Sequence, residues 1–483
     1  MTTKRMLLTC LILVWGFAQI QSASAGPNVL FLIADDLTAK ALSCYGNPQC
    51  QTPAIDQLAR EGVRFTHAYC QYPVCGPSRA ALMSGMYPES IGVMGNGGAS
   101  NYTKNLGERP SMSQHFQNQG YYAARVSKIY HMRVPGDITA GVDGPDHLAS
   151  WTERFNCHAP EWMSKGEHEH LTNEKLKFDP EGHYNLGFGG AFYVVRGSTN
   201  GSEQADTLAA DRAISLLRQH RDEPFFLAVG FVRPHVPLVA PEKYFEPYPS
   251  AEMQLTESIP NDLDDIPPAG RTHTSRGCGL NTEEKQQKVL SAYYAAVSFM
   301  DAQVGRVLNE LKALGLSEKT IVVFTSDHGY HLGEHTLWQK MSLHEESARI
   351  PLIIRTPDQL QAGTTRDALA EQIDIYPTLS ELCTFEIPAH VQGKSLAGVI
   401  RGEQAGVRRM AYSVVSKGSL LRTRNQAYLQ YRDGTEALYD MQQDPLQFHN
   451  LAADPAQAKT LERFRSALKQ KQSETQTAGR KAS

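Results

Sequence analysis

The chain has 483 residues, of which 41% are hydrophobic and 20% charged, and its formal net charge is −4. This length allows two or three domains, or one large domain with an appendage. The weakly acidic balance argues against a protein that binds nucleic acid or an acidic membrane surface through its overall charge. A local basic pocket for an anionic ligand remains compatible with this composition.

The first 25 residues are typical of a signal peptide for export. Lys4 and Arg5 precede an apolar run over 6–18, and Ala23-Ser24-Ala25 has the small-residue pattern of a cleavage site. The apolar run is short for a membrane span, and no later stretch is long and apolar enough to cross a membrane. We therefore expect residues 1–25 to be removed and the mature chain to be secreted or periplasmic, or lysosomal if the host is an animal.

Apolar runs alternate with amphipathic segments over most of the remaining chain. Residues 28–34 form an almost continuous apolar run, which is typical of a central parallel strand. Further strands are predicted over 63–69, 121–127, 224–231, 320–325 and 351–354. Helices are predicted over 53–60, 110–119, 206–220, 282–314 and 375–383. Residues 136–202 are irregular and are predicted to be loops over a functional site.

This alternation predicts an α/β fold, with a mostly parallel central sheet and helices on both of its faces. The pattern changes after about residue 406, where four short strands and a closing helix over 461–472 are predicted. These elements predict a small C-terminal α+β subdomain with an antiparallel sheet. The predicted division is therefore a catalytic domain over 26–405 and a subdomain over 406–483.

The segment Cys75-Gly76-Pro77-Ser78-Arg79 is predicted to join a strand to a helix. Pro77 suits the first helical turn, where a missing N–H group costs nothing. Cys75 is then expected just before a helix N-terminus, where free N–H groups and the helix dipole favour an anionic ligand. For a cysteine taken alone, an ordinary buried residue that precedes a helix is the simpler interpretation.

Polar residues follow four of the predicted strands, at the edge of the sheet where open α/β proteins bind their ligands. These residues are Asp35-Asp36, Lys128 with His131, His235, and Asp327-His328. Three carboxylates in one crevice are costly unless a cation neutralises them. Oxygen ligands favour calcium or magnesium over softer metals. An isolated Asp-Asp pair would more simply cap the next segment, but a second apolar strand that ends in Asp-His weighs against that interpretation.

These motifs resemble the type I, formylglycine-dependent sulfatases. Residues 75–79 match the C-x-P-S-R signature, in which a formylglycine-generating or other sulfatase-maturing enzyme oxidises the cysteine to formylglycine. The segments over 27–37, 326–335 and 438–441 also resemble the family, so the resemblance covers nearly the whole mature chain. It implies an alkaline phosphatase-like fold. The iduronate-2-sulfatase-like branch is the nearest match, carried by residues 127–131 and 233–237 and by Lys340.

The resemblance implies a metal site and a set of catalytic groups. The implied ligands of one Ca²⁺ per chain, with Mg²⁺ as the alternative, are Asp35, Asp36, Asp327, His328 and an oxygen of the modified Cys75. The implied catalytic residues are Cys75, Arg79, Lys128, His131, His235 and Lys340. The two lysines would offset charge on the sulfuryl oxygens, and the arginine would hold the modified residue. The histidine at 235 would protonate the leaving alcohol, and the histidine at 131 would help to regenerate the aldehyde.

The predicted function is hydrolysis of sulfate monoesters on a sulfated carbohydrate. A phosphate or phosphonate monoester hydrolase with the same modified cysteine is the closest alternative. A non-catalytic protein that binds sulfated glycans is the other, if Cys75 stays a thiol. Specificity for iduronate-2-sulfate is not expected to follow from the branch, because Tyr330 and Leu238 replace an expected tryptophan and an expected aromatic residue.

Overall fold

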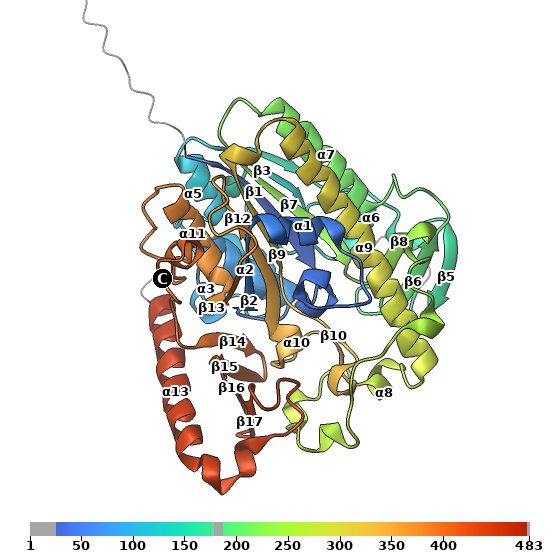
Figure 1. Ribbon diagram of the computed structural model, residues 1–483, viewed down its shortest axis with the longest axis vertical. Helices are drawn as coiled ribbons and strands as arrows, with labels where there is room; N and C mark the ends of the chain where they lie inside the picture. Colours follow the sequence, from blue (N-terminus) through green and yellow to red (C-terminus); the bar gives the residue numbers. More distant parts are fainter. Residues whose placement is uncertain (1–25, 174, 178–186, 481–483) are drawn as a thin grey trace, which may run out of the picture.

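An eight-stranded sheet with the order β13-β2-β12-β9-β1-β7-β3-β4 forms the centre of the computed structural model (Figure 1), which describes residues 26–173, 175–177 and 187–480. Its strands are β1 (Asn28–Asp35), β2 (Val63–Tyr69), β3 (Tyr122–Ser127), β4 (Glu153–Phe155), β7 (Phe225–Pro234), β9 (Thr320–Ser326), β12 (Arg349–Arg355) and β13 (Thr365–Glu371). Strand β12 runs antiparallel to both neighbours, whereas the other pairs in this sheet are parallel. The predicted mostly parallel sheet is therefore confirmed.

Helices cover both faces of this sheet because its central strand is apolar on both sides. Leu30 and Leu32 of β1 pack into one buried cluster, and Phe31 and Ile33 pack into another. The first cluster includes side chains of α1 (Pro53–Glu61), α7 (Ala205–Gln219) and α9 (Glu283–Ala313). The second includes side chains of α2 (Cys75–Ser84), α5 (Met112–Asn118), α11 (Ile375–Leu382) and α12 (Ala397–Arg401).

The region predicted as loops contains more regular structure than expected. Strands β5 (Gly166–His170), β6 (Tyr193–Gly197) and β8 (Leu238–Pro241) form a separate three-stranded sheet. All five residues of β5 are exposed, so the strand has no apolar alternation that a sequence pattern could detect. Trp162, Val195 and Val239 pack together beside this sheet. Its stability therefore depends on contacts between distant segments.

The C-terminal region forms the predicted antiparallel sheet. Its four strands are β14 (Ala411–Val415), β15 (Gly418–Arg422), β16 (Gln426–Tyr431) and β17 (Glu436–Asp440), and α13 (Ala458–Arg480) lies beside them (Figure 1). Leu461, Phe464 and Leu468 of α13 pack into a cluster that also contains Tyr69 and Ile373 of the larger region. The sheet is thus joined to the rest of the chain by a shared core. The boundary between residues 405 and 406 stays a prediction.

Shorter elements complete the described chain. They are α3 (Pro88–Ile91), α4 (Tyr102–Leu106), α6 (Gly136–Ala140), α8 (Ser275–Cys278), α10 (Glu345–Ala348), β10 (His331–Leu332) and β11 (Trp338–Gln339). None of the helices in the described part of the chain is long and apolar enough to cross a membrane. The predicted signal peptide, residues 1–25, lies outside the described residues.

Candidate active site

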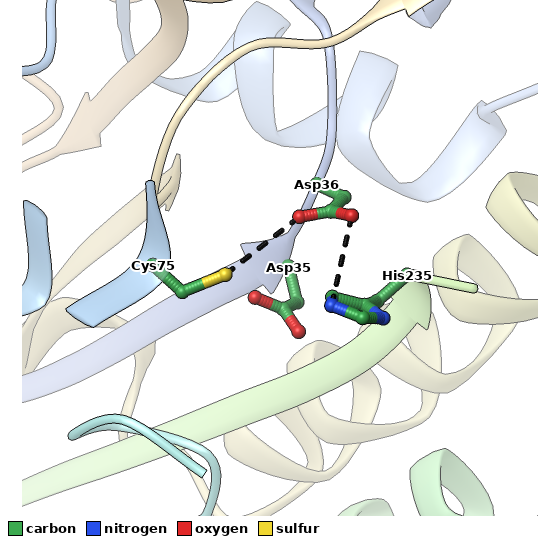
Figure 2. A group of neighbouring side chains, drawn as sticks. All are labelled: Asp35, Asp36, Cys75 and His235. Atoms are coloured by element: carbon green, nitrogen blue, oxygen red, sulfur yellow. Dashed lines mark hydrogen bonds and ion pairs between the residues drawn. The ribbon is translucent and has the colours of Figure 1, made fainter. Parts of the chain in front are cut away.

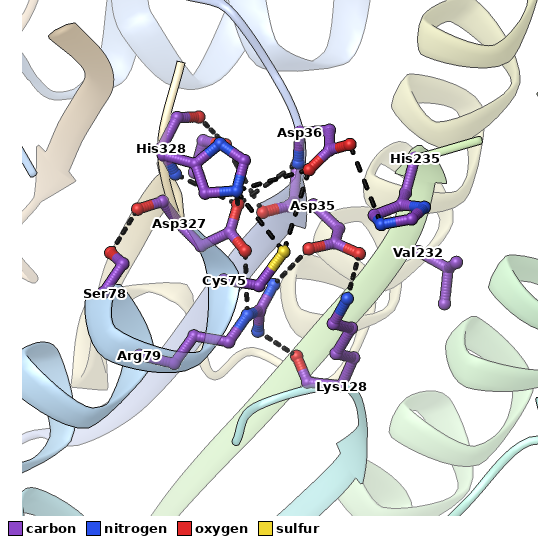
Figure 3. A network of polar contacts seen from close by, with 12 residues as sticks. Asp35, Asp36, Cys75, Ser78, Arg79, Lys128, Val232, His235, Asp327 and His328 are labelled. Atoms are coloured by element: carbon purple, nitrogen blue, oxygen red, sulfur yellow. Dashed lines mark hydrogen bonds and ion pairs between the residues drawn. The ribbon is translucent and has the colours of Figure 1, made fainter. Parts of the chain in front are cut away.

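The predicted site residues meet at one edge of the central sheet (Figure 3). Parallel strands bring their carboxyl ends to the same edge, and β1, β3, β7 and β9 each deliver polar side chains there. Helix α2 supplies Cys75 and Arg79 from its first turns, and Lys340 comes from the segment that follows β11. The structure thus brings together all ten predicted site residues: Asp35, Asp36, Cys75, Arg79, Lys128, His131, His235, Asp327, His328 and Lys340.

Cys75 is the first residue of α2 and lies at the centre of this group. We expected it just before the helix, but Val74 is the extended residue that precedes the helix. The Cys75 Sγ atom lies 3.4 Å from Nε2 of His328 and 3.5 Å from Nζ of Lys340. Figure 2 shows the same sulfur directed at the carboxylate of Asp36. Burial raises the pKa of this thiol, so an unmodified Cys75 stays protonated at neutral pH.

Arg79 is a fully buried cation that ties three strand ends together. Its Nε and Nη2 atoms donate to Asp327 Oδ2 at 2.9 Å and to Asp35 Oδ1 at 3.0 Å. Its Nη1 atom donates to the carbonyls of Lys128 and Ile129. Burial opposes the charge, but the two carboxylates outweigh it and raise the pKa of Arg79. The guanidinium therefore fixes the positions of both carboxylates beside Cys75.

Asp36 has a backbone conformation that places its carboxylate over Cys75. Its φ of 63° lies in the left-handed region, which is unusual for a residue other than glycine. The Asp36 N–H group donates to Asp327 Oδ1 at 3.1 Å, and its carbonyl accepts from the Tyr293 hydroxyl at 2.6 Å. These two contacts hold the strained residue in place. The Asp36 Oδ1 atom is 2.5 Å from Nζ of Lys340.

The carboxylates and histidines form a donor set that fits a hard cation. Asp35, Asp36, Cys75 and His235 form one group whose ligand atoms lie within 4.8 Å of one another, and Cys75 forms a second such group with Asp327 and His328. Oδ2 of Asp36 is buried without a hydrogen-bond partner.

The protonation of His328 supports the same fit. Its Nδ1 atom faces the Gly329 carbonyl at 2.8 Å and must carry a hydrogen there, because a carbonyl only accepts. Its Nε2 atom therefore faces Asp36 Oδ1 at 3.3 Å with either a proton or a lone pair. If Nε2 carries a lone pair, it and the Asp36 oxygen are both acceptors, and a cation between them would stabilise this arrangement. The residues present therefore fit a divalent cation.

The buried carboxylates differ in their electrostatic surroundings. Burial acts to raise the pKa of Asp35, but Lys128, His235 and Arg79 outweigh it and hold that pKa well below its usual value. Burial also raises the pKa of Asp327, where His328 and Arg79 offset it incompletely. The pKa values of these two buried carboxylates are therefore shifted in opposite directions.

Two histidines border the same pocket, and the side chains of both are buried. Burial lowers the pKa of His235 to about 3 and lowers the pKa of His131 well below its usual value, with Lys128 adding to the second shift. The Nδ1 atom of His235 lies 2.5 Å from the Val236 carbonyl, so its Nε2 atom faces Asp36 Oδ2 at 3.8 Å. The Nδ1 atom of His131 is buried without a hydrogen-bond partner. Both rings are therefore neutral at neutral pH in this arrangement.

A cavity of about 920 Å³ opens directly onto these groups. Its lining includes Cys75, His131, His235 and Lys340. Arg133 and residues of two further segments, 96–100 and 142–145, also line it. The segment over 142–145 belongs to the region that we predicted as loops over a functional site, whereas we predicted no role for 96–100, which has no motif and no regular spacing. Both segments reach the cavity through the folding of irregular loops.

Three further residues position the site without lining its cavity. Ser78 donates to Gln372 Oε1 at 2.7 Å and also to the Asp327 carbonyl, and Gln372 donates to the Ser326 carbonyl at 2.8 Å. Tyr293 of α9 holds the Asp36 carbonyl. Ser78 belongs to the C-x-P-S-R segment, so the sequence contained a signal for it. Gln372 and Tyr293 lie far away in sequence and carried no such signal.

The two residues that distinguish this chain from the iduronate branch do not contact the cavity. Tyr330 and Leu238 are each 1% exposed, and Tyr330 stacks on Tyr293 with ring centroids 5.6 Å apart. Both are absent from the cavity lining within the described residues. In this structure both side chains therefore contribute to core packing.

Comparisons with known proteins agree with this fold and site. The family model described as Sulfatase matches residues 27–384, and the one described as N-sulphoglucosamine sulphohydrolase, C-terminal, matches residues 333–474. A sulfatase of Formosa agariphila is 32% identical over 450 residues, covering 90% of this chain and 84% of that protein. Iduronate 2-sulfatase of Mus musculus is 30% identical over 411 residues, covering 77% and 71% of the two chains.

The chain therefore belongs to the sulfatase family, as its motifs predicted. A phosphonate monoester hydrolase from Silicibacter pomeroyi has a similar solved structure, with a TM-score of 0.74, 23% identity and coverage of 93% of this chain and 96% of that one. This likeness confirms the alkaline phosphatase-like fold. The family and its curated relatives identify the chain as a sulfuric ester hydrolase, which cleaves sulfate esters.

Proposed function

We propose that this sulfatase removes sulfate from a carbohydrate through a formylglycine made from Cys75 and one bound Ca²⁺. The observation that carries the proposal is the position of Cys75, buried at the start of α2 between Lys340, His328 and Asp36. A protonated thiol there is a poor nucleophile. A hydrated aldehyde at the same position would offer one hydroxyl to attack sulfur and a second whose deprotonation restores the aldehyde.

The cation would be held by the carboxylates of Asp35, Asp36 and Asp327, by His328, and by an oxygen at position 75. Bound there, it would lower the proton affinity of the attacking hydroxyl. Oxygen donors favour Ca²⁺, with Mg²⁺ as the alternative. Arg79 keeps two of the carboxylates aligned, and it holds the main chain before His131 through two carbonyls.

The remaining groups are placed to act on the sulfuryl group, on the oxygen of the leaving alcohol and on the hydroxyl groups of the modified residue 75. The ammonium groups of Lys128 and Lys340 lie within 2.5 Å of Asp35 and Asp36, where they would also attract sulfuryl oxygens. His235, on the opposite side of Asp36 from Lys340, would take up a proton when the anionic ester binds and then give that proton to the leaving alcohol. His131 has a free ring nitrogen and would accept the proton that is lost as the aldehyde forms again.

A sulfated carbohydrate is the substrate class that best suits this pocket. The relatives include iduronate 2-sulfatase, whose name specifies a sulfated sugar. The cavity of about 920 Å³ is large enough for a sugar residue, and its lining includes Arg133 and Lys340 beside neutral polar groups. We also infer export by the N-terminal segment, and a sulfatase-maturing enzyme as the partner that modifies Cys75.

Mass spectrometry of the peptide that contains residue 75 tests the modification. We expect a conversion of Cys75 to the aldehyde in protein from its own host, and turnover of sulfated oligosaccharides by that material. Unmodified cysteine in protein that turns over sulfate esters would contradict the proposed nucleophile. Unmodified cysteine without turnover would instead support a glycan-binding protein.

The Cys75→Ser and Cys75→Ala variants test the second hydroxyl. Both are expected to have no measurable multiple turnover, because alanine lacks the nucleophile and serine lacks the hydroxyl that expels sulfate. The serine variant should retain sulfate on the protein after one reaction, which intact mass spectrometry would detect. Full turnover by Cys75→Ser would refute this mechanism.

Matched sulfate and phosphate monoesters test the choice of ester. A sulfate monoester carries one negative charge and a phosphate monoester carries up to two, so the two differ in their demand on the cationic groups of the site. We expect a higher kcat/KM for the sulfate ester. A strong preference for the phosphate or phosphonate ester would favour the alternative hydrolase.

A further inference from the structure

We propose that the junction between the C-terminal sheet and the larger region carries a second binding site, for an anionic polysaccharide. We call it the basic groove and define it by six residues: Lys394, Arg408, Arg409, Arg424, Arg463 and Lys471. It consists of two cavities of about 430 and 800 Å³, and Arg408 and Arg409 line both. Among the described residues, no side chain that lines the groove also lines the catalytic pocket.

The first cavity lies between α13 and β14, which are neighbours in Figure 1. The Lys471 ammonium of α13 lies 3.9 Å from the centre of the Tyr87 ring and 5.9 Å from that of Tyr412. Lys394 approaches the carbonyl of Val407 at 3.4 Å. Neither ammonium forms an ion pair with a carboxylate in the described part of the chain, so both remain available to an anion.

The second cavity continues the line of positive charge along α13. Arg463 is exposed, donates to Gln426 Oε1 at 3.0 Å and has its Cζ atom 5.4 Å from the centre of the Phe464 ring. Arg409 is exposed and, within the described residues, neither it nor Arg463 has an ion-pair partner. Arg424 is already paired with Asp367. Four of the six cations of the groove are therefore unpaired: Lys394, Arg409, Arg463 and Lys471.

A cluster of unpaired cations is notable on a chain whose formal net charge is −4. The lining of the two cavities has six basic residues against two acidic ones, Glu474 and Asp367, and the resulting positive potential attracts a polyanion. Two adjoining cavities suit an extended ligand better than one small ion. Guanidinium groups bind sulfate and carboxylate groups through paired hydrogen bonds, which are the groups that a sulfated polysaccharide presents at each sugar.

The aromatic residues of the groove favour a polysaccharide over a nucleic acid. Single-stranded nucleic acids bind through bases stacked on exposed rings. Tyr87 and Tyr412 are only 3% and 1% exposed, and Lys471 lies over them, so neither ring offers a stacking surface. The groove therefore recognises charge along a chain. This inference rests on the proposed sulfatase function. The groove would hold a polymeric substrate while one sulfate ester of that polymer occupies the catalytic pocket.

Binding of dextran sulfate to the full-length protein tests the groove. The test variant is Lys394→Ala with Arg409→Ala and Arg463→Ala, which are exposed residues whose loss removes no buried ion pair. The matched control is Arg221→Ala with Lys243→Ala and Lys312→Ala, which removes the same charge from other exposed positions. We expect the test variant to bind roughly tenfold more weakly and with a smaller dependence on salt, and the control to change by less than about twofold.

Turnover of para-nitrophenyl sulfate separates this proposal from the proposed function. The test variant should turn over this small ester as the unaltered protein does, because it keeps the catalytic pocket. Absence of turnover of both this ester and sulfated oligosaccharides in all proteins, with the binding difference intact, would overturn the proposed function and leave the groove supported. Equal weakening in test and control variants, or no binding of dextran sulfate, would overturn the groove. A groove-dependent preference for single-stranded DNA would overturn the assignment to polysaccharide.

Discussion

At the scale of single residues, burial gives position 75 its chemical character. The thiol of Cys75 is 1% exposed, and burial raises its pKa even though Lys128 and Lys340 act to lower it. Such a thiol is inert, because burial disfavours the charged thiolate that would react. An aldehyde hydrate is neutral, so burial does not disfavour it in the same way. The surroundings that suppress thiolate chemistry are therefore compatible with the proposed modification.

His235 is the residue whose role depends most on the leaving group. Its ring is neutral in the free protein, because burial lowers its pKa to about 3, so it must gain a proton, which the negative charge of a bound sulfate ester would favour, before it can protonate the leaving oxygen. We expect His235→Asn to lower kcat roughly 100-fold for an alkyl sulfate, and less than about tenfold for para-nitrophenyl sulfate. Steady-state kinetics with both esters checks this. Equal losses for both would assign the ring to positioning, and exposed His449→Asn is the control.

Removal of the metal tests the carboxylate cluster. We expect one Ca²⁺ per chain in the purified protein, and loss of both turnover and thermal stability after treatment with a chelator. Calcium at 100 times its Kd should restore about 2.7 kcal/mol of stability, because it binds the folded chain alone. Elemental analysis and a calcium titration of Tm measure this. Asp36→Asn should weaken the response, and an unchanged response would remove Asp36 from the ligand set.

At the scale of elements, α9 is the support on which the site is built. This helix spans Glu283–Ala313, and its Tyr293 hydroxyl holds the carbonyl of the strained Asp36. Two turns further on, Asp301 accepts from the N–H groups of Ala54 and Ile55 at 3.1 and 2.8 Å. Asp301 thereby caps α1, whose own N-cap residue makes no such bond. One helix thus anchors both a ligand-bearing turn and a neighbouring helix.

Replacement of Asp301 tests this cap. Asp301→Ala is expected to lower the free energy of unfolding by about 1–2 kcal/mol, because two N–H groups at the start of α1 lose their acceptor. Urea denaturation measures the change. The conservative Asp301→Asn variant should lose less, since its single amide oxygen can still accept from one of the two N–H groups. An equal loss in both variants would indicate that packing, and not capping, is the main contribution.

The pH dependence of stability provides an independent test of the same residue. Burial raises the pKa of Asp301 from 3.8 to about 7. Between these values the folded state binds more protons than the unfolded state, so the contribution of Asp301 to stability declines as the pH rises. Asp301→Asn removes this titration. We expect Tm to fall more steeply from pH 5 to 7 in the unaltered protein than in the variant, and parallel curves would contradict the shift.

At the scale of the whole molecule, a buried ion-pair network joins the C-terminal region to the larger one. Arg408 pairs with Glu371 Oε2 at 2.5 Å and also with Asp374, and its side chain is 5% exposed. The Tyr87 hydroxyl donates to the same glutamate at 2.6 Å. Because β14 begins three residues later, this network sets where the antiparallel sheet meets the parallel one.

Breaking this network is expected to destabilise the entire protein. Arg408→Met leaves two buried carboxylates without their cation, which costs about 3–5 kcal/mol. The adjacent Arg409→Met removes an exposed arginine and should cost less than about 0.5 kcal/mol. Equilibrium unfolding in urea compares the two. A similar small effect for both would show that the shared apolar core, and not the ion pairs, holds the regions together.

The sequence by itself determined the central sheet and predicted the polar residues that meet at its edge. The apolar strands that end at Asp35, Ser127 and Ser326 carry their polar residues directly after them, and parallel pairing brings such ends to one edge. The Cys75–Arg79 segment marked the helix that closes the group. These features were predictable because strand period and strand direction act over a few residues. The C-terminal antiparallel strands were predictable for the same reason.

Tertiary structure alone decided the features that depend on contacts across long stretches of chain. Tyr293 reaches the Asp36 carbonyl from 257 residues away, and Arg408, in the segment before β14, reaches Glu371 from 37 residues away. The exposed strand β5 and the basic groove likewise have no local period or motif. The physical reason is that packing and ion pairing are selected by shape and charge in three dimensions, which residue spacing along the chain does not encode.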